Sequence, residues 1–198
     1  VATSGDTGKA ALEGFADVPG TQIIVFYPSE GVSDIQKQQM ITQAGKNVKV
    51  FGIEGNFDDA QRGVKEIFGN TALSDELEKK GYTFSSANSI NWGRLVPQIV
   101  YYFSAYVDAV KAGKIAAGDP INFVVPTGNF GDILAGYYAK MMGLPIDRLL
   151  CASNSNNVLT DFINTGVYDR RREFFKTASP SMDILVSSNL ERLLYSVT

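Results

Sequence analysis

The sequence predicts an α/β fold made of parallel sheets and covering helices, and two observations lead to that class. Short runs rich in β-branched and aromatic residues alternate with longer helix-patterned segments, most clearly between residues 20 and 70. Turns that contain glycine or proline separate these runs. Strands that alternate with helices normally pair in parallel through right-handed crossovers, so we expect parallel sheets.

The first half of the chain is predicted to contain a helix, a strand, a helix, a strand and two helices. Asp17-Val18-Pro19-Gly20 is a turn signal that ends the first helix. Ser33 and Asp34 can cap the second helix, and Gly45 can end it. Acidic residues directly after Asn56 are typical of the first turn of another helix. The expected spans are 9–16, 22–27, 34–44, 48–53, 57–68 and 74–80.

The second half is predicted to contain one long helix, followed by alternating strands and helices. The long helix carries one stripe of apolar residues, which is typical of a face packed on a core: Leu95, Ile99, Tyr102, Phe103 and Tyr106. We divide the chain near residue 87 into two α/β units, 1–87 and 88–198. The expected spans of the second half are 91–112, 121–125, 131–142, 148–152, 156–163 and a last strand at 182–186.

Composition excludes several classes of partner. The chain has 198 residues, of which 44% are hydrophobic, and this is enough material to bury a core. A formal net charge of −3 gives no basic footprint for nucleic acid. The sequence contains no apolar run long enough to cross a membrane, and its single cysteine is typical of a reducing compartment. We therefore expect a cytoplasmic protein that binds neither nucleic acid nor membrane.

The chain contains no histidine, and this absence limits the chemistry it can perform. Catalysis by Ser–His or Cys–His pairs is excluded, and so is the commonest metal ligand. No cluster of cysteines offers a zinc site either. We expect no metal, and any enzyme of this sequence must take much of its chemistry from a cofactor.

Two glycine-containing loops are the candidate binding sites. Thr3-Ser4-Gly5-Asp6-Thr7-Gly8 and Pro126-Thr127-Gly128-Asn129-Phe130-Gly131-Asp132 each lead directly into a helix-patterned segment. The first N–H groups of a helix have no partner within it, and glycine lets an anion approach them closely. The pair of loops therefore predicts a ligand set with two anionic groups. The alternative is that both are ordinary turns between strands and helices, which need glycine whether or not anything binds.

Four segments in order along the chain resemble the threonine synthases. They are Ser4-Gly5-Asp6-Thr7-Gly8-Lys9-Ala10-Ala11, Asn88-Ser89-Ile90-Asn91-Trp92, Pro126 to Tyr137, and Ser187-Ser188-Asn189-Leu190-Glu191-Arg192-Leu193-Leu194. The resemblance extends over essentially the whole chain. It implies a lyase that uses pyridoxal 5'-phosphate to convert O-phospho-L-homoserine and water into L-threonine and phosphate, the last step of threonine biosynthesis. Monomer and homodimer both stay open.

The resemblance also implies the fold and the lobes. Threonine synthases have the fold-type II, tryptophan-synthase-β-like architecture of pyridoxal-phosphate enzymes, whose α/β units are three layers around a parallel sheet. Residues 1–87 are then expected to form a small lobe with the loop for the substrate carboxylate. Residues 88–198 are expected to form part of the large lobe that binds the cofactor. The architecture is expected to be incomplete in this chain.

The same resemblance assigns residues to the cofactor and the substrate. It implies that Asp6 contacts the ring oxygen of the cofactor, where relatives in the wider fold usually have asparagine. The residues implied to hold the cofactor phosphate are Gly128, Asn129, Phe130, Gly131 and Asp132. Those implied on the substrate side are Ser4, Gly5, Asp6, Thr7, Asn88, Ser89, Asn91 and Arg94.

Some of these residues also have simpler interpretations. Arg94 can pair with the phosphate leaving group through its two-pronged guanidinium, or it can be an exposed residue in the first turn of a helix. Asn88 can be a helix cap. For Ser187-Ser188-Asn189 we favour helix capping, because Glu191 follows at the spacing of a capping box.

The lysine that carries the cofactor in this family lies upstream of the Ser-Gly-Asp-Thr-Gly segment. We therefore expect a fragment that lacks the N-terminal part, has no catalytic residue in this chain and does not turn over by itself. Lys9 and Lys140 are poor substitutes, because one is on a helix surface and the other is more than two turns from its loop.

Three alternatives come from other families. A threonine dehydratase or cysteine synthase shares the fold, but its phosphate loop is typically richer in glycine. A non-catalytic α/β module that binds a phosphorylated small molecule is the second. A dinucleotide-dependent dehydrogenase is disfavoured, because neither loop has the three-glycine spacing of that class.

Overall fold

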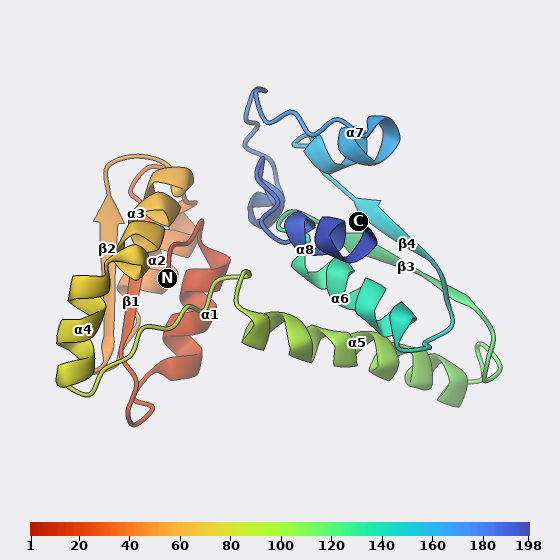
Figure 1. The fold of residues 1–198 in the computed structure, drawn as a ribbon, viewed down its shortest axis with the longest axis horizontal. Coiled ribbons are helices and arrows are strands. Elements are labelled where there is room, and N and C mark those ends of the chain that lie inside the picture. Colours follow the sequence, from red (N-terminus) through yellow and green to blue (C-terminus); the bar gives the residue numbers. More distant parts are fainter. The chain divides into compact units, whose positions relative to one another are not determined.

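The computed structural model describes residues 1–198, except for the side chain of Asp58, and consists of two compact units (Figure 1). The first unit is Val1–Asn88 and the second is Ser89–Thr198. Each unit contains a pair of parallel strands with helices packed against them. The α/β class and the parallel pairing predicted from the sequence are therefore confirmed.

The first unit packs its helices against two neighbouring strands. Its elements are α1 (Asp6–Phe15), β1 (Ile23–Pro28), α2 (Asp34–Ile41), β2 (Val48–Ile53), α3 (Phe57–Gly69) and α4 (Thr71–Lys79). β1 pairs with β2 in register from Ile23 opposite Val48 to Pro28 opposite Ile53. The Phe26 N–H donates to the Val1 carbonyl, and the Phe26 carbonyl accepts from the Thr3 N–H. Since neighbouring residues of a strand bond to opposite sides, β1 lies between β2 and the stretch 1–3.

The core of the first unit explains why α1 and α2 cover this sheet. Leu12 of α1, Val25 of β1 and Met40 of α2 are completely buried together. The predicted cap at Ser33 is present as a capping box, in which the Ser33 side chain and Gln36 each bond to the other's backbone. α2 ends at Ile41, earlier than the expected residue 44.

The second unit is built around β3 and β4. Its elements are α5 (Trp92–Lys111), β3 (Ile121–Pro126), α6 (Gly131–Met141), β4 (Ile146–Ala152), α7 (Val158–Thr165), a 3₁₀ turn (Pro180–Met182) and α8 (Leu190–Val197). β3 pairs in parallel with β4, and its last residue, Pro126, lies opposite Ala152. α5 runs along α6 (Figure 1).

The apolar stripe of the long helix faces the core of the second unit, as predicted. Leu95, Tyr102 and Tyr106 are buried, while Ile99 and Phe103 pack against the same cluster. The ring of Tyr102 meets Phe123 of β3 edge to face, with ring centres 4.8 Å apart. Gly136 of α6 makes this packing possible, because a Cβ there would lie 2.7 Å from the Tyr102 ring.

The strand predicted at 182–186 is wrong. The segment begins in the 3₁₀ turn, and its backbone then bonds locally, with the Ile184 N–H donating to the Met182 carbonyl. The carbonyl of Leu185 accepts from the hydroxyl of Tyr168 instead of from a neighbouring strand. The apolar residues that suggested a strand include Met182 and Ile184, which pack against Gly128.

Candidate anion-binding loops

The loop that follows β3 turns sharply into α6. The Thr127 N–H still pairs with the Ala152 carbonyl at 2.8 Å, so the strand pairing extends to the start of the loop. Phe130 occupies the N-cap of α6 in the left-handed conformation, with φ 65° and ψ 5°. This backbone costs a non-glycine residue about 1–2 kcal/mol. The ring of Phe130 is buried in the core cluster, which offsets that cost.

The loop presents a row of consecutive backbone N–H groups where it enters α6. Among the described residues, none accepts a hydrogen bond from the N–H of any residue from Gly128 to Asp132. The N–H of Leu134 donates to the Phe130 carbonyl and closes the first turn of α6. Consecutive N–H groups at a helix start form a concave site of positive potential for an anion. We call residues 128–132 the anion cradle.

A segment far along the chain holds the cradle in place, and we call residues 182–189 the strap. The Ser187 hydroxyl donates to the Gly128 carbonyl at 2.6 Å. The Asn189 backbone and side-chain amides both donate to the Asn129 carbonyl, at 3.0 and 3.2 Å. A Cβ on Gly128 would lie 3.0 Å from the Ile184 side chain, so glycine lets the strap approach.

The capping role predicted for Ser187-Ser188-Asn189 is therefore wrong. Asn189 stands at the N-cap of α8, but its side chain makes no cap hydrogen bond. It is completely buried and bonds to the cradle instead. A backbone carbonyl 60 positions away accepts from its amide, and the local sequence contains no sign of that contact.

Asp132 lies at the C-terminal end of the cradle. The hydroxyl of Tyr102 donates to its carbonyl at 2.8 Å and to its carboxylate at 3.3 Å. Desolvation by the surrounding protein raises the pKa of the Asp132 carboxyl, and the hydrogen bond from Tyr102 opposes that rise. Burial, together with the Asp132 charge, also raises the pKa of the Tyr102 hydroxyl.

The loop before α1 is held by a buried threonine. Thr3 is 1% exposed, and its hydroxyl oxygen accepts from the Gly5 N–H and the Gly8 N–H, both at 2.9 Å. Gly5 has φ 140°, and a Cβ there would overlap the side chain of Gln36. A Cβ on Gly8 would lie 2.5 Å from the Thr3 methyl group. Both glycines are thus required by this tight turn.

Gln36 orients the carboxylate of Asp6. Its side-chain amide donates to Asp6 Oδ1 at 2.8 Å, while its carbonyl oxygen accepts from Ser33 in the capping box. Sequence reasoning did not select Gln36. The Ser33 capping pattern predicts where its backbone lies, but gives no sign that its side chain also reaches Asp6.

The segment 88–94 contains residues with different partners. Asn88 is not a helix cap, because its side chain pairs with the Ala2 backbone in both directions, at 3.2 and 2.5 Å. The cap of α5 is Asn91, whose side chain accepts from the Gly93 N–H at 2.8 Å. Arg94 is half-buried, and burial lowers the pKa of its guanidinium. In the second unit, the Ser89 carbonyl accepts from Asn189 at 3.1 Å, which links Ser89 to the cradle.

Lys9 and Lys140 are held by other partners. The Lys9 ammonium pairs with Glu13 at 2.7 Å and also contacts Gln43. The Lys140 ammonium donates to the Asp147 carbonyl at 2.8 Å. The described part of the chain brings no three acidic or cysteine side chains together as metal ligands. Its helices include none with both the length and the apolar content to cross a membrane.

Comparison with known proteins identifies the relatives of this chain. No family model matches it. The human protein threonine synthase-like 1 is 52% identical over 202 residues, which cover 98% of this chain and 27% of the relative. Threonine synthase of Saccharomyces cerevisiae is 44% identical, and the match covers 98% of this chain and 36% of that protein.

A solved structure of a threonine synthase is also similar to this chain. The crystal structure of threonine synthase from Brucella melitensis with bound pyridoxal phosphate superposes with a TM-score of 0.81 at 47% identity, covering 98% of this chain and 39% of that one. The chain thus spans between about a quarter and two fifths of the length of these relatives. Over 98% of its length it is homologous to the threonine synthases, and it shares the α/β fold of these fold-type II enzymes.

Proposed function

We propose that this chain supplies the cofactor-phosphate and substrate-carboxylate loops of a pyridoxal-phosphate-dependent threonine synthase. The reaction is the conversion of O-phospho-L-homoserine and water into L-threonine and phosphate. Homology over 98% of the chain supports the family, although the chain spans only 36% of the yeast enzyme. The observation that carries the proposal is the anion cradle, in which consecutive N–H groups at the start of α6 lack acceptors among the described residues.

The cradle fits the phosphate of the cofactor. Its N–H groups offer the donors that phosphate oxygens require, and the start of α6 adds partial positive charge. We assign Gly128, Asn129, Phe130, Gly131 and Asp132 to this role. Bound there, pyridoxal phosphate supplies a ring that accepts electrons when a substrate loses its α-proton.

Asp6 is assigned to the ring oxygen of the cofactor. The amide of Gln36 donates to Asp6 Oδ1 at 2.8 Å and so fixes how the carboxyl is turned. A carboxylate only accepts hydrogen bonds, whereas a protonated carboxyl also donates one. A hydrogen bond from Asp6 to an anionic ring oxygen therefore requires that Asp6 hold a proton.

The remaining assignments concern the substrate. Ser4, Gly5, Asp6 and Thr7 are proposed to receive the substrate carboxylate at the start of α1, where the helix dipole favours an anion. Asn88, Ser89 and Asn91 are proposed to contact other polar groups of the substrate. Arg94 is proposed to pair with the phosphate that leaves, since guanidinium binds phosphate with two parallel hydrogen bonds.

We further propose that the lysine that carries the cofactor belongs to another segment of the full-length protein. Lys9 and Lys140 are the lysines nearest to the two loops in sequence, and both have partners elsewhere. The 198-residue chain by itself is therefore expected not to turn over O-phospho-L-homoserine.

A second candidate is a protein that binds a phosphorylated ligand in the same cradle without this reaction. The relative with 52% identity is named for its likeness to threonine synthase, and that name specifies no reaction. This candidate keeps the cradle and its phosphate but predicts no release of phosphate from O-phospho-L-homoserine.

The test is a product assay on the full-length protein loaded with pyridoxal phosphate. Threonine synthase activity predicts equal amounts of L-threonine and inorganic phosphate from O-phospho-L-homoserine. Release of ammonia from L-threonine or L-serine would instead indicate a dehydratase. Tight cofactor binding without any product would favour the binding module.

A further inference from the structure

The strap holds two neighbouring peptide groups of the cradle by their carbonyls. Ser187 donates to the Gly128 carbonyl at 2.6 Å, and Asn189 donates twice to the Asn129 carbonyl. In a trans peptide the C=O and the N–H that follows it point in opposite directions. A carbonyl held toward the strap therefore turns the next N–H away from it. The N–H groups turned in this way belong to Asn129 and Phe130.

The side-chain amide of Asn189 has only one orientation that satisfies its neighbours. Arg192 donates to Asn189 Oδ1 at 3.2 Å, so the oxygen of the amide faces the guanidinium. The nitrogen then faces the carbonyls of Asn129 and Ser89, at 3.2 and 3.1 Å. An amide nitrogen carries two hydrogens, and these two carbonyls can use both. The contact is therefore completely satisfied in a buried position.

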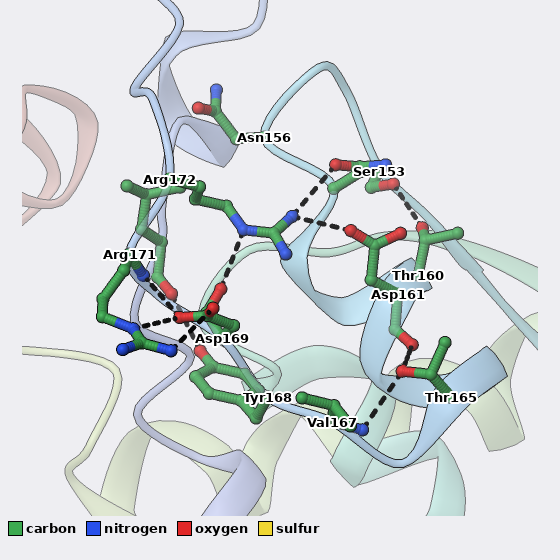
Figure 2. Close-up of polar contacts among 12 residues, drawn as sticks. Ser153, Asn156, Thr160, Asp161, Thr165, Val167, Tyr168, Asp169, Arg171 and Arg172 are labelled. Atoms are coloured by element: carbon green, nitrogen blue, oxygen red, sulfur yellow. Dashed lines mark hydrogen bonds and ion pairs between the residues drawn. The ribbon is translucent and has the colours of Figure 1, made fainter.

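The strap itself is anchored at several points within the second unit. The Tyr168 hydroxyl donates to the Leu185 carbonyl at 2.9 Å and accepts from the Ser187 N–H at 2.8 Å. Figure 2 shows Tyr168 next to Asp169, whose backbone carbonyl accepts a hydrogen bond from the Arg172 side chain. Arg172 pairs with Asp161 of α7 at 2.8 Å.

A second anchor lies at the beginning of the strap. The carboxylate of Asp183 accepts from the side chains of Asn154, Asn156 and Thr177, at 2.7, 3.0 and 2.7 Å. It also accepts from the Thr177 N–H at 2.9 Å. The strap thus has anchors outside the cradle at Asp183, Leu185 and Ser187, so it can impose an orientation on the cradle.

We propose that Ser187 and Asn189 are positioning residues of the anion cradle. They hold the Gly128 and Asn129 carbonyls on the strap side and thereby aim the N–H groups of Asn129 and Phe130 at the cofactor phosphate. The same hydrogen bonds restrain the backbone of Phe130 in its left-handed conformation. The inference rests on the proposed function, because it assumes that the anion in the cradle is the phosphate of pyridoxal phosphate.

The experiment compares two ligands that differ only in the phosphate, pyridoxal phosphate and pyridoxal, on the full-length protein. Asn189→Asp keeps the size of the side chain but replaces the donating nitrogen by an oxygen, and Ser187→Ala removes only the hydroxyl. The matched control is Asn47→Asp in the first unit, since the Asn47 amide also donates to two backbone carbonyls, those of Phe15 and Thr21. Dissociation constants and apoprotein melting temperatures are measured for each.

We expect Asn189→Asp to raise the dissociation constant for pyridoxal phosphate about tenfold or more. The buried carbonyls lose their donor, and the cradle N–H groups are then no longer held toward the phosphate. Pyridoxal affinity stays at the wild-type value, and Ser187→Ala shows the same selective loss to a smaller degree. The Asn47→Asp control leaves the dissociation constants for both ligands at their wild-type values. If both variants weaken the binding of the two ligands equally, or leave both dissociation constants unchanged, the positioning role is refuted whatever the melting temperatures are. A wild-type protein that does not prefer pyridoxal phosphate over pyridoxal would refute the proposed function itself.

Discussion

At the scale of single residues, the two glycine-containing loops depend on side chains that bond to their backbones. Thr3 holds the first loop through the Gly5 and Gly8 N–H groups, while Asn189 holds the second through the Asn129 carbonyl. Both are buried. Sequence reasoning selected the glycines of the two loops, because glycine lets an anion approach a helix start closely. In the structure Gly5 has φ 140°, and a Cβ on Gly8 would lie 2.5 Å from the Thr3 methyl group. Sequence reasoning missed the role of Asn189, since an asparagine before an amphipathic segment is an ordinary cap signal.

Phe130 provides a test of backbone strain in the cradle. Its φ is 65°, and its ring is buried in the core. Phe130→Ala loses the ring and keeps the strain, whereas Phe130→Gly loses the ring and removes the strain. We expect both variants to lower the free energy of unfolding by about 3 kcal/mol or more, with glycine the milder by about 1 kcal/mol. Urea unfolding of the two variants gives this difference, and an alanine variant at least as stable as the glycine variant would contradict it.

Tyr102 provides a test of the pKa of Asp132. The Asp132 carboxyl binds its proton more tightly in the folded protein than in the unfolded chain, because burial raises its pKa. Its contribution to stability therefore declines as pH rises from the ordinary aspartate value of about 3.9 through the raised pKa. Tyr102→Phe removes a hydroxyl that donates to the carboxylate, so the pKa rises further and the decline extends to higher pH. Carbon NMR titration of the Asp132 carboxyl measures this shift, and an unchanged or lower pKa would count against it.

At the scale of elements, most helices and strands could be predicted because each carries its own periodic pattern and punctuation. The strands 48–53 and 121–125 lie between turn signals, and the observed β2 and β3 match them within a residue. The segment 182–186 could not be predicted in this way. Its apolar residues pack on Gly128, and its neighbour Ser187 bonds to a carbonyl 59 positions away. Contacts of that range leave no local period in the sequence.

The packing of α5 on α6 depends on a glycine. A Cβ on Gly136 would lie 2.7 Å from the Tyr102 ring and 2.9 Å from Leu149, so Gly136→Ala must force the two helices or the ring apart. We expect it to destabilise the protein by about 1–3 kcal/mol. The matched control is Gly63→Ala in the interior of α3, where a Cβ meets nothing within 4 Å.

The control is expected to stabilise the protein by about 0.5–1 kcal/mol, since alanine favours a helix more than glycine does. Thermal or urea unfolding of both variants measures the two changes. Equal effects at Gly136 and Gly63 would show that close packing at α5 and α6 is not what requires glycine.

At the scale of the whole molecule, each unit leaves apolar residues of its parallel sheet exposed. Val124 and Leu150 are 65% and 44% exposed in the second unit, and Phe51 is 50% exposed in the first. Parallel sheets normally have both faces covered by helices. The chain spans 27% of its human relative, so the relative contains much more polypeptide than this chain does.

We expect the 198-residue chain, when it is produced alone, to self-associate through these strands. Replacing both Val124 and Leu150 by threonine is expected to reduce the association. Ile35→Thr on α2 is the control, because Ile35 is 72% exposed but lies outside the sheets. Light scattering after size-exclusion chromatography measures the mass of each species over a range of concentrations. A monomer at high concentration would contradict the expectation.

The most direct test of the central claim is a crystal structure of the full-length protein with pyridoxal phosphate. We predict that oxygens of the cofactor phosphate lie within about 3.2 Å of the backbone nitrogens of Asn129, Phe130 and Gly131, with the Asn129 carbonyl still bonded to Asn189. A cofactor whose phosphate is bound elsewhere, with no anion in the cradle, would contradict the account.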